Sequence, residues 1–149
     1  MIEVRECSKT FGSVKAVNKA TLDIGDREVF GLVGSNGAGK STLLRMMAGI
    51  IRPDAGEILI DTLPVYENEE AKKLFFYISD DSYFPSNYTA ADMVRFYRNF
   101  YPEFRIKLFH ELMDQFHLEE RRKISTFSKG MKKQLLMIIG VCAATKYLF

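Results

Sequence analysis

The sequence has 149 residues, of which 47% are hydrophobic and 27% charged, a balance typical of one soluble globular domain with a packed core. Its formal net charge of +2 is too small to predict binding to nucleic acid or to an anionic membrane surface. The longest apolar run, Leu135 to Ala144, is about half as long as a membrane-spanning helix, and the N-terminus shows no signal-peptide pattern.

The first segment of the chain predicts two strands. Apolar and charged residues alternate over residues 2–5, as in a half-buried strand. Residues 10–13 are typical of a turn, and Ala16 to Ile24 reads as a second strand. We therefore expect an antiparallel hairpin at the N-terminus.

The next feature is a glycine-rich motif. Residues 34–42, Gly-Ser-Asn-Gly-Ala-Gly-Lys-Ser-Thr, fit the pattern G-x-x-x-x-G-K-[ST]. The apolar run Val29–Val33 before it predicts a buried strand, and Leu43–Ala48 after it predicts a helix. This strand–loop–helix setting is the one that a phosphate-binding loop requires.

The residue types in the motif suit a phosphate chain. Glycines let the backbone turn its N–H groups inward, and the start of a helix adds unpaired donors and a positive dipole end. Lys40 is expected to reach the β- and γ-phosphates, and the Ser41 hydroxyl to bind Mg²⁺. A turn that merely joins strand to helix is the alternative. The candidate nucleotide-binding residues are Gly34, Ser35, Asn36, Gly37, Ala38, Gly39, Lys40, Ser41 and Thr42.

The segment after the motif predicts more sheet. Gly49 is a plausible C′ residue that ends the helix, and Pro53 to Gly56 is typical of a turn. Glu57–Ile60 and Leu74–Ile78 are strand candidates. Strands mixed with crossover helices imply an α/β sheet with the phosphate site at the carboxyl ends of its strands.

A helical subdomain follows in the sequence. Thr89 and Asp92 resemble a capping box, and helical spacing of apolar residues continues from Met93 until Pro102. A second helix carries apolar residues on one face between residues 108 and 116. These aromatic and methionine stripes predict core rather than a ligand site. The two histidines, His110 and His117, lie at no ligand spacing.

The last segment begins with a charged run over residues 119–123, which predicts a solvated turn. Ser128 then looks like a helix N-cap, and Tyr147 to Phe149 reads as the start of a buried strand. The two cysteines, Cys7 and Cys142, lie outside any metal or redox spacing. We expect both to be reduced thiols in or near the core of a cytoplasmic protein.

Combined with the phosphate loop, these features resemble the ATP-binding subunits of ABC transporters along the whole chain. Phe11 falls where that family places an aromatic residue that stacks on adenine, and residues 34–42 match its Walker A loop. Residues 127–131, Phe-Ser-Lys-Gly-Met, match its signature sequence, usually Leu-Ser-Gly-Gly-Gln, at Ser128 and Gly130. The Ser-Lys-Gly-Met form is similar to the branch associated with bacterial drug resistance and efflux.

The resemblance implies ATP and Mg²⁺ as ligands. It also implies a head-to-tail homodimer or pseudo-dimer, in which Ser128 and Gly130 of one subunit cap the ATP bound to the Walker A loop of the other. The dimer is expected to dock on separate integral membrane permease subunits, at the cytoplasmic face of the membrane, and to drive export. No nucleic acid partner is expected.

The sequence departs from the family pattern at one position between sheet and helical subdomain. The glutamine that touches Mg²⁺ in the family falls near Asp80 here, and no glutamine occurs in that stretch. Asp80 is shorter and charged, so it either binds Mg²⁺ through water or caps a turn.

The family's Walker B Asp-Glu pair and its switch histidine have no counterpart in the sequence. We therefore expect the N-terminal part of an ABC-type domain, an α/β fold incomplete at its C-terminus. Its expected parts are a β and phosphate-loop core (1–82), a helical subdomain with the signature (83–130), and the signature helix with the next strand (131–149). No catalytic residue is expected in the chain, which should bind nucleotide and hydrolyse it poorly or not at all.

Three other functions fit parts of the pattern. One is a soluble ABC-type ATPase that acts on ribosomes or DNA, and another is a nucleotide-binding module without hydrolysis. The third, an unrelated P-loop kinase or GTPase, is disfavoured by residues 128–130 and by the helical insertion.

Overall fold

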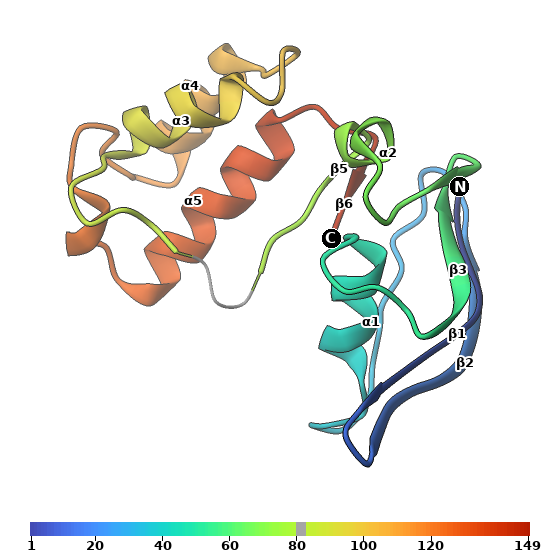
Figure 1. Ribbon diagram of the computed structural model, residues 1–149. Helices are drawn as coiled ribbons and strands as arrows, with labels where there is room; N and C mark the ends of the chain where they lie inside the picture. Colours follow the sequence, from blue (N-terminus) through green and yellow to red (C-terminus); the bar gives the residue numbers. More distant parts are fainter. Residues whose placement is uncertain (80–82) are drawn as a thin grey trace. The chain divides into compact units, whose positions relative to one another are not determined.

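The computed structural model describes residues 1–79 and 83–149 (Figure 1). The chain divides into two compact units, Met1–Leu74 and Phe75–Phe149. Each unit has its own buried apolar core.

The first unit contains a four-stranded antiparallel sheet in the order β2-β1-β3-β4. Its strands are β1 (Ile2–Phe11), β2 (Val14–Ile24), β3 (Ala55–Ile60) and β4 (Leu63–Pro64). The predicted N-terminal hairpin is therefore confirmed. The predicted strand at Glu57–Ile60 is also confirmed, although it begins two residues earlier, at Ala55.

A bulge keeps the apolar residues of β1 on one face. Ile2 and Val4 are buried, and strict alternation would turn Cys7 to the opposite side. Glu6 adopts a φ of 46°, and the register with β2 shifts between Val4 and Cys7. Because the extra residue restores the phase of the pleat, Cys7 is fully buried with the other two.

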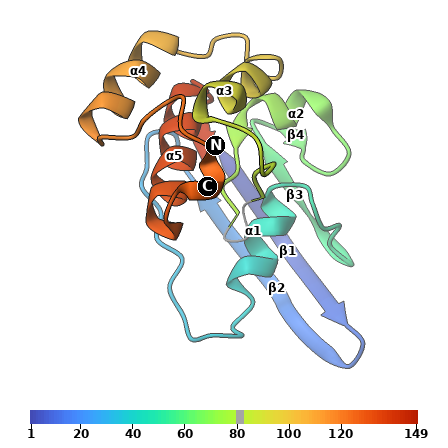
Figure 2. The ribbon, with the colours of Figure 1, turned by 90° about the vertical axis from the view of Figure 1, so that its left-hand side faces the viewer.

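Helix α1 (Lys40–Met47) lies against one face of this sheet (Figure 2) and buries Leu43, Met46 and Met47. It ends where the sequence predicts. Gly49 has a φ of 64°, its N–H donates to the Met46 carbonyl, and the next N–H donates to the Arg45 carbonyl. This is the Schellman arrangement, which satisfies the last carbonyls of a helix. A short helix, α2 (Glu69–Lys73), completes the unit and is capped by the Asn68 side chain.

The predicted buried strand at Val29–Val33 is wrong. Residues 28–35 have no regular secondary structure, Val29 is fully exposed and Val33 is 93% exposed. A continuous apolar run predicts burial on both faces, but a strand forms only where another strand pairs with it. Among the described residues, no strand lies beside this segment in either sheet.

Over its described residues, 75–79 and 83–149, the second unit contains two short parallel strands and three helices. Its strands are β5 (Phe75–Phe76) and β6 (Tyr147–Leu148), and its helices are α3 (Ala90–Arg98), α4 (Ile106–Gln115) and α5 (Lys129–Cys142), with a 3₁₀ turn at Ile124–Thr126. The strand predicted over Leu74–Ile78 thus forms only in part. The strand predicted at Tyr147 is confirmed.

The helices α3, α4 and α5 pack around one core (Figure 1). The predicted core role of the aromatic and methionine stripes is confirmed for most members, but it is wrong for Phe96, Phe100 and Phe116, which are exposed. The core side chains include Phe76, Met93, Phe104, Phe109, Met113, Leu135, Ile138, Ile139 and Cys142. Both cysteines are free thiols, as predicted.

Candidate nucleotide-binding site

The phosphate-loop motif forms a tight turn that leads into α1. Gly37 and Gly39 have φ values of 83° and 87°, a backbone region that favours glycine. Gly39 is also the N-cap of α1, and a Cβ atom built there would lie 2.0 Å from the carbonyl oxygen of Ala16 in β2. The third glycine of the loop therefore packs against the sheet so closely that no side chain fits there.

Lys40 folds back over this loop. Its Nζ donates hydrogen bonds to the carbonyl oxygens of Gly34 and Ser35, each at 2.7 Å. The Ala38 N–H donates to the same Ser35 oxygen at 3.2 Å. The ammonium group is thus fixed beside the exposed peptide groups of residues 34–38, where it can neutralise an anion.

The residues present fit a phosphate chain and its Mg²⁺ ion. The first turn of α1 carries no acidic side chain, so nothing there opposes an anion at the helix N-terminus. Ser41 is exposed and offers one hydroxyl oxygen, the ligand type that Mg²⁺ prefers. Mg²⁺ bound to a nucleotide usually takes its other ligands from phosphate and water.

Phe11 lies at the end of β1 and is 49% exposed, so part of its ring is accessible. Lys9 Nζ lies 5.7 Å from the centre of that ring and donates to Asp54 Oδ1 at 2.7 Å. Asp54 Oδ2 accepts a second bond, also of 2.7 Å, from the Thr10 N–H. These two bonds, from Lys9 first, lower the pKa of Asp54 below its ordinary value.

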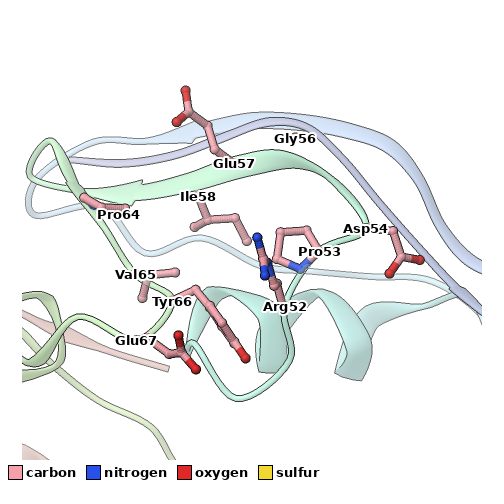
Figure 3. A pocket seen from close by; sticks show the side chains of 10 residues that line it. All are labelled: Arg52, Pro53, Asp54, Gly56, Glu57, Ile58, Pro64, Val65, Tyr66 and Glu67. Carbon is pink, nitrogen blue, oxygen red and sulfur yellow. The ribbon is translucent and has the colours of Figure 1, made fainter.

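The sequence did not single out Lys9 or Asp54. Residue types predict only that Asp54 is part of the turn at Pro53–Gly56 (Figure 3), a position where aspartate is common. Its acceptor role depends on β1 and β3 being neighbours in the sheet, and residue spacing does not reveal that.

The signature segment lies at the start of α5, in the second unit. Ser128 is the N-cap, as predicted, and its Oγ accepts a hydrogen bond from the Met131 N–H at 3.2 Å. Phe127 is buried, whereas Ser128 and Gly130 are exposed. A Cβ atom at Gly130 would meet only Ser128 Oγ, at 3.8 Å. The start of α5 is therefore an open helix end anchored by one aromatic side chain.

The candidate residues fall in different parts of the chain. Phe11 and residues 34–42 belong to the unit Met1–Leu74, and Ser128 and Gly130 to the unit Phe75–Phe149. Asp80 lies outside the described residues. Of the two histidines, His110 lies 2.5 Å from Glu120, measured from Nδ1 to the carboxylate oxygen.

A family model described as ABC transporter matches residues 17–149, which include the phosphate loop and the signature segment. The chain belongs to the ABC transporter family. The family and the α/β fold expected from the resemblance are confirmed.

Several curated ABC proteins resemble the chain. YtrB, an ABC transporter ATP-binding protein of Bacillus subtilis, is 34% identical over 143 residues, which cover 96% of this chain and 49% of YtrB. SkfE, a SkfA peptide export ATP-binding protein of Bacillus subtilis, is 30% identical over 92% of this chain and 59% of its own length. RbsA, a ribose import ATP-binding protein of Pseudomonas putida, is 38% identical over 64% of this chain and 19% of its own length. The chain thus spans about half the length of YtrB.

Solved ABC structures share the fold. An ATP-binding subunit of an ABC transporter superposes with a TM-score of 0.89 and 24% identity, over 99% of this chain and 65% of that chain. The dimeric cassette MJ0796 superposes with a TM-score of 0.84 and 23% identity, over 99% of this chain and 72% of the MJ0796 chain. In the described ranges, 1–79 and 83–149, no helix combines the length and the apolar character needed to cross a bilayer.

Proposed function

We propose that the chain is the ATP-binding part of an ABC transporter subunit that couples ATP-driven dimer closure to export by separate membrane subunits. The observation that carries the proposal is the phosphate loop. Lys40 is fixed over the exposed loop at the N-terminus of a helix whose first turn lacks acidic residues.

In this function residues 34–42 hold the phosphates. Lys40 would give up its hydrogen bonds to the Gly34 and Ser35 carbonyls and donate to the terminal phosphates instead. Ser41 would contribute its hydroxyl to Mg²⁺. Phe11 offers its accessible ring to the adenine base. We assign Asp80 a contact to Mg²⁺ through water, on the basis of its position in the sequence.

The signature residues act on the nucleotide of a second subunit. Ser128 and Gly130 lie at an exposed helix start, which attracts anions as the phosphate loop does. If they cap the γ-phosphate of a partner's ATP, the closed dimer is stabilised while that phosphate is present. ATP then works as a switch between open and closed dimers.

Export is the direction that the coverage of the relatives favours. SkfE, named for peptide export, aligns over 92% of the chain, whereas the ribose import protein RbsA of Pseudomonas putida aligns over 64%. We place the subunit in the cytoplasm, at the inner face of the membrane beside a permease. For the 149-residue chain itself we propose nucleotide binding without appreciable turnover, because its sequence contains no Asp-Glu pair.

Calorimetry of the purified chain with ATP and Mg²⁺ tests the proposal. Lys40→Ala is expected to weaken ATP binding by roughly 10- to 100-fold, since it removes charge-assisted hydrogen bonds to phosphate. Lys73→Ala is the matched control, because it removes the same charge from an exposed position paired with Glu70 in the same unit. It should bind ATP as the unmodified chain does.

A folded chain with no affinity for ATP or GTP at any Mg²⁺ concentration would contradict nucleotide binding. Turnover of about 1 per second or more would contradict the absence of hydrolysis. Recovery of the natural protein with ribosomes or DNA, rather than with membrane proteins, would favour the soluble ABC-type ATPase over the transporter subunit.

A further inference from the structure

Asp54 organises the end of β1, where Phe11 lies. Its carboxylate accepts hydrogen bonds from the Lys9 ammonium and from the Thr10 N–H, each at 2.7 Å. Its own N–H donates to the Ser8 carbonyl at 2.8 Å. Asp54 therefore binds all three residues that precede Phe11, although it is distant from them in the sequence.

The Lys9 side chain transmits this restraint to the aromatic ring. Lys9 Nζ lies 5.7 Å from the centre of the Phe11 ring, within cation–π range, and its side chain is only 17% exposed. A lysine ammonium that lost its carboxylate partner would gain by moving into water, because it is strongly hydrated. Asp54 holds it beside the ring, and Phe11 is still 49% exposed, so part of the ring is left for a ligand.

We propose that Asp54 is a positioning residue for nucleobase stacking. It fixes Lys9 and the backbone at Thr10, so that the accessible part of the Phe11 ring keeps a constant orientation. This rests on the proposed function, because it requires that Phe11 stacks on the base. Asp54 follows α1 in the chain. It therefore also connects the segment that carries Phe11 with the helix whose N-terminus carries the phosphate loop.

A purely structural role makes a different prediction. If Asp54 only fastens β3 to β1, its loss lowers the stability of the unit and weakens every ligand alike. If it positions Phe11, its loss weakens only the base-dependent part of binding. Inorganic tripolyphosphate has no base, so it separates the two roles when it is compared with ATP.

The experiment measures dissociation constants for ATP and for tripolyphosphate, with Mg²⁺, on the 149-residue chain. Phe11→Ala is expected to weaken ATP roughly 5- to 150-fold, the range for loss of one base–aromatic stack. Asp54→Asn keeps an acceptor for Thr10 but cannot neutralise Lys9, so it should weaken ATP roughly 3- to 10-fold, a part of the stacking effect. Tripolyphosphate binding should be unchanged in both variants.

Two further variants complete the test. In the Phe11→Ala background, Asp54→Asn should have no additional effect, because residues that act through one contact are not additive. Asp23→Asn is the matched control, since it removes the same charge from an exposed position on β2. Its affinities for both ligands should equal those of the unmodified chain.

Equal weakening of ATP and tripolyphosphate by Asp54→Asn would overturn the positioning role, and so would an unchanged ATP affinity. If Phe11→Ala leaves ATP binding intact, stacking is absent and the inference falls while nucleotide binding stands. If the unmodified chain binds neither ligand, the proposed function itself fails.

Discussion

At the scale of single residues, the three glycines of the phosphate loop differ in their backbone conformation and in the space available for a side chain. Gly34 has no left-handed φ, and a Cβ there would make ordinary contacts of 3.5 Å with Ala38. Gly37 has a φ of 83° but open space around it. Gly39 combines a φ of 87° with a Cβ position 2.0 Å from the Ala16 carbonyl oxygen. A side chain at Gly37 would meet backbone strain alone, whereas one at Gly39 would meet backbone strain and steric overlap together.

We predict graded losses of stability when each of these glycines is replaced by alanine. Gly34→Ala should cost little, and Gly37→Ala about 1–2 kcal/mol for the left-handed backbone. Gly39→Ala should cost about 2–5 kcal/mol, because the β2 backbone must also move away. Urea unfolding of the three variants measures the differences. Equal losses for Gly37→Ala and Gly39→Ala would contradict the close approach of loop and sheet.

At the scale of elements, α3 begins with a complete capping box. Thr89 Oγ1 accepts from the Asp92 N–H at 3.2 Å, and Asp92 Oδ2 accepts from the Thr89 N–H at 3.0 Å. Two donors of the first turn are thereby satisfied by side chains. The aspartate reaches the backbone although it is one methylene shorter than the usual glutamate.

Thr89→Val should lower the free energy of unfolding by about 1 kcal/mol, because it keeps the shape of threonine but removes the capping oxygen. Thr89→Ser is the control and should lose only a few tenths of a kcal/mol, since serine caps as well as threonine. Chemical denaturation monitored by circular dichroism measures both. A Thr89→Val variant as stable as the unmodified chain would show that the cap contributes nothing.

These elements also show what sequence can and cannot predict. The hairpin, the capping box and the helix end at Gly49 depend on residues close together in the chain, and all three are confirmed. The strands at Val29–Val33 and Leu74–Ile78 depend on pairing with distant segments, and the first is absent while the second is short.

The same distinction holds for the site. The motif located residues 34–42, but the bond of Asp54 to Lys9 joins segments that only the sheet brings together.

At the scale of the whole molecule, groups in both units link stability to pH. Asp54 and Asp92 have lowered pKa values, caused by Lys9 and by the Thr89 N–H. Burial raises the pKa of Cys7, and it raises that of Cys142 from 9.0 to about 11. Each carboxylate contributes stability above its ordinary pKa near 3.8, which is lost as pH falls through the lowered folded value. Each thiol contributes stability below its ordinary pKa, which is lost as pH rises through the raised folded value.

We therefore predict a stability plateau near neutral pH with a decline on both sides. Between pH 9 and the folded pKa of about 11, the unfolded chain releases the Cys142 proton while the folded chain retains it, so unfolding becomes more favourable. One such thiol can contribute a slope of up to about 1.4 kcal/mol per pH unit. Urea unfolding at closely spaced pH values measures the slope, and Cys142→Ala should be less stable throughout but decline less steeply above pH 9. Identical alkaline slopes for Cys142→Ala and the unmodified chain would contradict the assignment, as would rapid labelling of native Cys142 by iodoacetamide at pH 8, where a buried protonated thiol is inert.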